Sequence, residues 1–234
     1  MEELIAYITK FYLTKILLWI SVGAALINAV KIKPKERLHS FLLIYLVFEL
    51  SLGLFDNAIT PSKQISSTIK SYYINYTNIL ICLVEFNFFS HLHDKVFNNS
   101  KRKTTFILRV ILFSLAALTF SYTLIVDISH ILQLTFLLGS IEFLFIFYLS
   151  IGYFMKVIRN PSPISLFNRG SFWCFLGSIL YCSISAPFYI VGPKFPIGND
   201  FYDALLPALL YYLPYSILFC CILISLKCKT PIWS

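Results

Sequence analysis

The chain has 234 residues, of which 58% are hydrophobic and only 13% are charged, and its formal net charge is +8. A soluble domain carries about 25% charged residues, so the composition excludes an ordinary soluble protein and indicates an integral membrane protein. The basic residues lie in clusters beside apolar runs, a pattern typical of membrane topology and anionic-lipid contact rather than of nucleic-acid binding.

Hydropathy predicts seven membrane-spanning helices, because each apolar run approaches the twenty or so residues that cross a hydrocarbon core of roughly 30 Å. Polar residues and prolines interrupt the pattern between most of these runs. We therefore predict an all-α fold in which residues 1–234 form a single polytopic membrane domain, a bundle of seven transmembrane helices. The predicted spans are about 11–30, 41–60, 72–92, 106–126, 131–155, 171–192 and 202–226.

Lysine and arginine are unevenly distributed between the predicted loops. The loops that follow spans 2 and 6 carry only Lys63, Lys70 and Lys194. The segments that follow spans 1, 3, 5 and 7 contain or adjoin Lys31, Lys33, Lys35, Arg37, Lys95, Lys101, Arg102, Lys103, Lys156, Arg159, Arg169, Lys227 and Lys229. The positive-inside rule then predicts an N-terminus outside and a C-terminus in the cytoplasm. Arg109, near the inner end of span 4, is expected to extend to the lipid headgroups.

Three glutamates interrupt apolar runs: Glu49 in YLVFELSLGL, Glu85 in ICLVEFNFFSHLH and Glu142 in LLGSIEFLFIF. At about 1.5 Å per residue, Glu49 and Glu85 lie roughly 12 Å from the cytoplasmic end of their spans, and Glu142 lies closer to mid-membrane. An ionised side chain at the centre of a span costs about 2.5–3.5 kcal/mol. We therefore expect all three carboxylates to face the interior of the bundle.

Helical periodicity places further polar residues on the faces that carry these glutamates. Glu49 shares its face with Tyr45, Gly53 and Asp56, and Glu85 shares its face with Cys82. The predicted ligand or proton pocket comprises Glu49, Glu85, Glu142, Asn78, Ser178, Tyr181, Ser185, Tyr211 and Tyr215. Lys15 and Asp56 are a possible ion pair in the outer part of the bundle; the alternative is that Lys15 extends outward to the membrane surface.

Two interpretations of the glutamates stay open. Either they are neutral, hydrogen-bonded acids that only hold helices together, or they form a site for a ligand, an ion or protons. In both, a low dielectric and like-charged neighbours disfavour the ionised form, so at least one of Glu49 and Glu85 is expected to be protonated at neutral pH.

The sequence does not contain the residues that several familiar membrane-protein chemistries require. The last span contains no lysine for a retinal Schiff base. Of four histidines, only His91 and His93 are neighbours, and this spacing directs them about 200° apart on a helix, so we expect no metal site. No cofactor and no catalytic triad are predicted, and enzymatic activity is not favoured.

Four stretches carry a resemblance to known proteins: YLVFELSLGLF, YINYTNILICLVEFNFF, LLGSIEFLFIFYLSIGYF and NRGSFWCFLGSILYCS. Through them the chain resembles a family of uncharacterised seven-helix membrane proteins that are frequent in low-GC Bacteroidetes. The resemblance implies the seven-helix fold, in a bacterial cytoplasmic (inner) membrane, and equates the family glutamates with Glu49, Glu85 and Glu142. It implies no activity, and the last helix has Tyr211 and Tyr212 where members of the family carry a His-Asn pair.

The leading functional hypothesis is a receptor-like or sensory module. It would bind a small or lipidic ligand within the bilayer and signal through its basic inner loops to a separate protein. The first alternative is a proton-coupled transporter or carrier that uses Glu49 and Glu85, and the second is a lipid-modifying membrane enzyme.

Overall fold

The fold was analysed in a computed structural model, which describes residues 2–32, 37–59, 66–98, 100–125, 131–160, 165–191 and 212–228. This part of the chain contains seven α-helices and no strand, which confirms the all-α prediction. The helices are α1 (Glu2–Lys31), α2 (Arg37–Ile59), α3 (Ser67–Val96), α4 (Arg102–Ile125), α5 (Ile131–Arg159), α6 (Gly170–Val191) and α7 (Leu213–Lys227), and a short 3₁₀ helix, η2 (Leu166–Asn168), precedes α6.

Three of these helices contain a segment long and apolar enough to cross a membrane: Leu38–Phe55, Arg102–Tyr122 and Gln133–Arg159. They support a membrane protein. The helices extend beyond the predicted spans, since α1 begins at Glu2 and α3 runs from Ser67 to Val96. Hydropathy detects the apolar part of a helix and misses polar turns at its ends. The start of the seventh predicted span lies outside the described residues.

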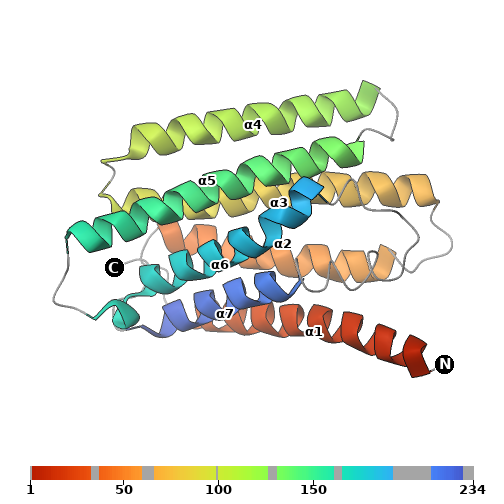
Figure 1. The fold of residues 1–234 in the computed structure, drawn as a ribbon, viewed down its shortest axis with the longest axis horizontal. Helices are drawn as coiled ribbons and strands as arrows, with labels where there is room; N and C mark the ends of the chain where they lie inside the picture. The colour runs from red at the N-terminus through yellow and green to blue at the C-terminus, as the bar shows by residue number, and fades with distance from the viewer. Residues whose placement is uncertain are drawn as a thin grey trace.

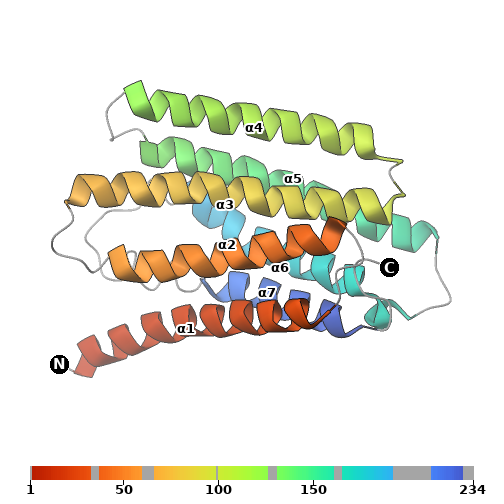
Figure 2. The same cartoon turned by 180° about the vertical axis from the view of Figure 1, so that it is seen from behind.

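The helices lie side by side with their long axes roughly aligned, and α4 and α1 occupy opposite edges of the bundle (Figures 1 and 2). In space, α1 packs on α2, α2 on α3, α3 on α5, α5 on α6, α6 on α7, and α7 back on α1. These six helices therefore form a closed ring. Because α3 contacts α5 directly, α4 lies outside this ring against both of them.

Small residues bring α6 close to its two neighbours in the ring. A Cβ atom added to Gly177 of α6 would lie 2.7 Å from the Cβ of Cys221 on α7. At the next residue of α6, the hydroxyl of Ser178 lies 2.7 Å from the hydroxyl of Ser150 on α5. Close approach through glycine and hydrogen bonding between hydroxyls are the two usual ways in which membrane helices associate.

A buried ionic network joins α3 to α4. The Nη2 of Arg109 lies 2.9 Å from the Oδ2 of Asp94, and its Nε donates to the hydroxyl of Ser90 at 2.7 Å. The hydroxyl of Thr105 donates to the other oxygen of Asp94. The expectation that Arg109 extends to the headgroups is therefore wrong. An antiparallel helix offers a carboxylate at the same depth, and pairing with it satisfies the guanidinium inside the protein.

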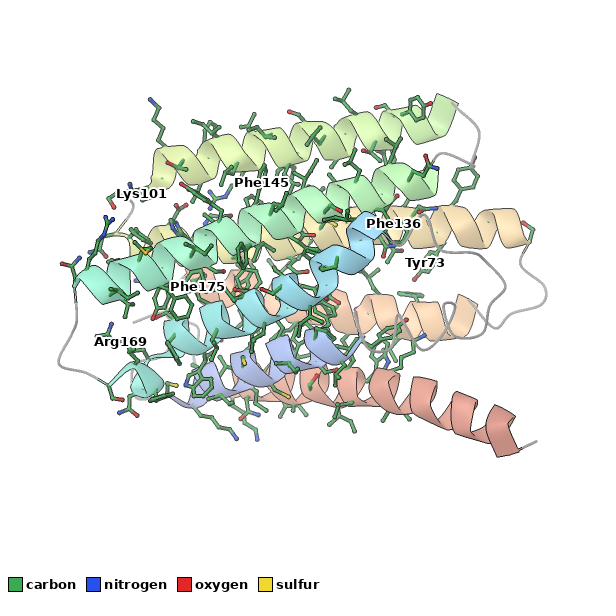
Figure 3. The ribbon with its side chains drawn as sticks, in the orientation of Figure 1. Tyr73, Lys101, Phe136, Phe145, Arg169 and Phe175 are labelled. Atoms are coloured by element: carbon green, nitrogen blue, oxygen red, sulfur yellow. The ribbon has the colours of Figure 1, made fainter. Side chains whose placement is uncertain are left out.

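The same end of the bundle is held together by Lys156 of α5. Its ammonium donates to the backbone oxygen of Val96, the last residue of α3, and lies 4.7 Å from the centre of the Phe97 ring. The carbonyl of Val96 has no partner within its own helix, so the lysine caps α3. Lys101 and Arg169 lie at one end of the bundle, and Tyr73 and Phe136 lie towards the other (Figure 3).

Candidate buried carboxylate site

The three glutamates come from three members of the helix ring and are all buried. Glu49 of α2 is 9% exposed, Glu85 of α3 is 0% exposed and Glu142 of α5 is 1% exposed. Glu85 interacts electrostatically with both of the other carboxylates. We call Glu49, Glu85 and Glu142 the carboxylate cluster.

Two tyrosines complete the polar centre of the ring. The hydroxyl of Tyr45 on α2 lies 3.2 Å from the hydroxyl of Tyr215 on α7, and either can donate. Tyr215 is a polar neighbour of both Glu49 and Glu85. Since Tyr45 also neighbours Glu85, the two linked hydroxyls lie against the acids of α2 and α3.

The carboxylate oxygens are nevertheless poorly satisfied. Both oxygens of Glu85, and the Oε1 atoms of Glu49 and Glu142, are buried and make no hydrogen bond of normal geometry with the part of the protein that the structure describes. Glu142 has the thiol of Cys82 as a polar neighbour, and a thiol is a weak donor. Tyrosine hydroxyls and the thiol lie beside these oxygens but outside regular hydrogen-bond geometry, so four buried oxygen atoms are less well satisfied than is usual in native proteins.

Aromatic rings enclose this polar centre. Tyr181 of α6 stacks on Tyr215 with 4.8 Å between ring centres, and Phe143 meets Tyr181 edge to face at 5.0 Å. Tyr45 packs between Phe88 of α3 and Phe219 of α7, at 5.4 and 5.5 Å. The ring contacts leave the polar atoms of the cluster in a low-dielectric environment, where electrostatic interactions are strong.

The structure brings some of the predicted pocket residues together and separates others. Tyr181 and Tyr215 lie at the cluster, and Ser185 is fully buried with its hydroxyl lacking a hydrogen bond to any described residue. The hydroxyl of Ser178 is instead engaged by Ser150 and by the carbonyl of Phe175.

Asn78 is half-buried on α3. It lies seven residues from Glu85, which corresponds to about 10 Å along the helix. This separation places it away from the polar centre that the carboxylate cluster forms.

Three further predicted residues cannot be placed at the cluster. Tyr211 lies outside the described residues, as does the side chain of Asp56, so the proposed ion pair of Asp56 with Lys15 stays a prediction. The ammonium of Lys15 lies 5.9 Å from the centre of the Tyr212 ring.

Sequence reasoning left two residues out of the predicted pocket. Tyr45 and Cys82 are buried beside the carboxylates, and both had been placed on the faces of Glu49 and Glu85 by helical periodicity. The signal was therefore present. A rule that admits every polar or thiol side chain within one turn of a buried acid would have included both.

The chemistry available to the cluster is that of oxygen acceptors. No three His, Cys, Asp or Glu side chains within the described ranges are close enough together to hold a metal ion. Unpartnered carboxylate oxygens in an apolar environment bind protons, or the hydrogen-bond donors of a small ligand.

No protein-family model matches the chain, and searches of curated proteins and of solved structures find nothing similar to it. The resemblance to a seven-helix family thus stays a prediction.

Proposed function

We propose that the protein is a receptor-like or sensory membrane protein with seven spans, in which the carboxylate cluster takes up protons or a small ligand and the resulting change is passed to a separate protein. The three apolar segments support the membrane location. Of the other helices, α1 and α3 have 30 residues each and α6 has 22, enough to cross roughly 30 Å at about 1.5 Å per residue.

The burial of Glu85, with both oxygens outside regular hydrogen-bond geometry, carries this proposal. If the acids served only to hold helices together, each would donate and accept hydrogen bonds across a helix interface, as Ser150 and Ser178 do. A buried polar group without a partner costs about 1–3 kcal/mol. Three helices each carry an acid with this unfavourable free energy. Their arrangement therefore favours a site that binds protons or a ligand over a purely structural contact between helices.

The arrangement suggests how occupancy could be transmitted. Adding or removing one positive charge at Glu85 changes its repulsion with Glu49 and Glu142, and hence the preferred spacing of α2, α3 and α5. The inner ends of α3 and α5 are tied by Lys156, so a displacement of one would be carried to the other. The basic connections at that end would present the change to a cytoplasmic partner.

A proton-coupled carrier is the second candidate, favoured by the hydroxyl pair of Tyr45 and Tyr215 beside the acids. Hydroxyls in series with carboxylates can relay protons between helices. The two candidates differ in flux: a carrier moves protons across the membrane, whereas a sensor only binds them.

The experiment uses spin labels at the inner ends of α3 and α6 of the purified protein in lipid nanodiscs, and measures their separation during a pH titration. A sensor predicts a pH-dependent separation that Glu85→Gln abolishes and the control Ser150→Ala retains. The same proteins, in liposomes with a trapped pH dye, report proton flux under a pH gradient. Wild-type flux that Glu85→Gln abolishes selects the carrier. Neither a change in separation nor flux would refute the carrier and the sensor that responds to protons.

A further inference from the structure

A groove between α4 and α5 lies outside the helix ring that encloses the carboxylate cluster. Its volume is about 720 Å³. It forms because α4 is peripheral and touches the rest of the bundle through α3 and α5. The walls are mostly apolar and include Leu115 and Leu118 of α4 and Leu134, Leu137 and Ile141 of α5.

The polarity of the groove changes along its length. Its polar lining residues are Thr119, Ser121 and Tyr122 near the end of α4 and Gln133 near the start of α5. Because α4 and α5 are antiparallel neighbours (Figure 1), these residues share one end of the groove. From Gln133 to Ile141 the groove then runs about 12 Å along α5 past leucine side chains.

Among the residues that the structure describes, none of the side chains that line the groove is charged. Its polar end therefore offers hydroxyl and amide groups, which both donate and accept hydrogen bonds, and no cation to neutralise a phosphate or carboxylate. An anionic head would lose hydration here without gaining a charged partner. The lining matches a head that is polar and uncharged, followed by an apolar chain.

We propose that this groove binds a single-chain amphiphile with an uncharged, hydrogen-bonding head, of the class of long-chain alcohols and monoglycerides. The head lies among Tyr122, Gln133 and Thr119, and the chain follows the leucines towards Ile141. The general lipid coat differs, because it also covers exposed faces away from the groove, such as that of Ile44 on α2, which is 56% exposed. The site is separate from the carboxylate cluster and does not depend on the function proposed for it.

The test is photolabelling of the full-length protein in lipid nanodiscs with a long-chain alcohol that carries a diazirine in its chain. Labelled residues are identified by mass spectrometry, with unlabelled alcohol and phosphatidylglycerol as competitors. The expected labels lie on α4 and α5 inside the groove. The alcohol should displace them and phosphatidylglycerol should not.

Substitutions sharpen the test. Leu137→Trp fills the groove and should lower groove labelling about tenfold, because excluding two methylene groups from an apolar site already has an effect of that order. Ile44→Trp is the matched control: Ile44 lies on α2, outside the groove, and is as exposed as Leu137, at 56%, so this change should leave labelling unchanged. Leu118→Trp, from the α4 wall, replaces Leu137→Trp if that variant does not fold. Gln133→Leu should weaken labelling by the alcohol but not by a hydrocarbon probe with no head.

Two results would overturn the proposal. Labels spread evenly over the groove and the face of Ile44 on α2 would mean ordinary lipid contact. Equal displacement by the alcohol and by phosphatidylglycerol would mean that the groove does not select an uncharged head.

Discussion

The ion pair between Asp94 and Arg109 gives the sharpest prediction about stability. Asp94→Asn keeps the shape of the side chain but removes its charge, and so leaves a guanidinium that is only 16% exposed without its counter-charge. Removing one partner of a buried ion pair costs about 3–5 kcal/mol. Since the guanidinium retains Ser90 and some exposure, we expect a loss of about 2–3 kcal/mol, at or below the lower bound of that range.

The assay is equilibrium unfolding in mixed micelles, applied to a double-mutant cycle of Asp94→Asn and Arg109→Gln. The double variant should be less destabilised than the sum of the single variants, because each single change strands the other partner. Arg102→Gln, at an exposed arginine at the start of the same helix, is the control and should have little effect. If Asp94→Asn matches this control, or if the cycle is additive, Arg109 does not depend on Asp94 and extends to the lipid headgroups after all.

Three further predictions concern packing, pH and topology. Gly53→Ala should destabilise the protein by about 1–3 kcal/mol, because the new Cβ would overlap the indole ring of Trp19 at its Cη2; Trp19→Leu in the same chain should restore the unfolding free energy, and a loss that persists would refute the clash. Burial lowers the pKa of His93, just beyond the predicted span, to about 4, against about 6.5 in an unfolded chain. Its contribution to stability is therefore complete above about pH 6.5 and declines as the pH falls towards 4, so His93→Gln should flatten the pH dependence of the melting temperature over that interval, and an unchanged slope would count against it. A reporter active only in the cytoplasm should work when fused after Ser234 and fail within residues 193–200; the reverse would invert the predicted orientation.

The sequence predicted the helical architecture because hydropathy and periodicity are local properties. The apolar runs located the helices, and the insertion cost of a charge indicated that Glu49, Glu85 and Glu142 lie inside the bundle. Periodicity assigns residues to a face, but it does not say which neighbouring helix that face meets. The packing of α3 directly on α5, with α4 outside them, depends on contacts between distant segments and could not be deduced from any single span.

The same limit explains the individual errors. Span 4 by itself offers Arg109 no partner, so the sequence predicts a side chain that extends to the lipid headgroups. Asp94 lies in the predicted loop, but in the helical hairpin of α3 and α4 it falls at the same depth as Arg109. Ser178 shares a face with Tyr181 in sequence, but its short side chain reaches only as far as Ser150 on the adjoining helix. A short polar side chain such as that of Ser178 contacts only the adjoining helix, whereas a long one such as that of Tyr181 reaches Tyr215 at the polar centre of the helix ring.

The unfolding free energy of Glu85→Leu, relative to that of the wild type, tests the functional interpretation of the carboxylate cluster most directly. If Glu85 is an unpartnered acid kept for binding, an apolar side chain of similar size removes a buried cost, and the variant should be as stable as the wild type or more stable by about 1 kcal/mol or more. A loss of more than about 1 kcal/mol would show that Glu85 makes stabilising hydrogen bonds, and the cluster would then be a structural contact between helices.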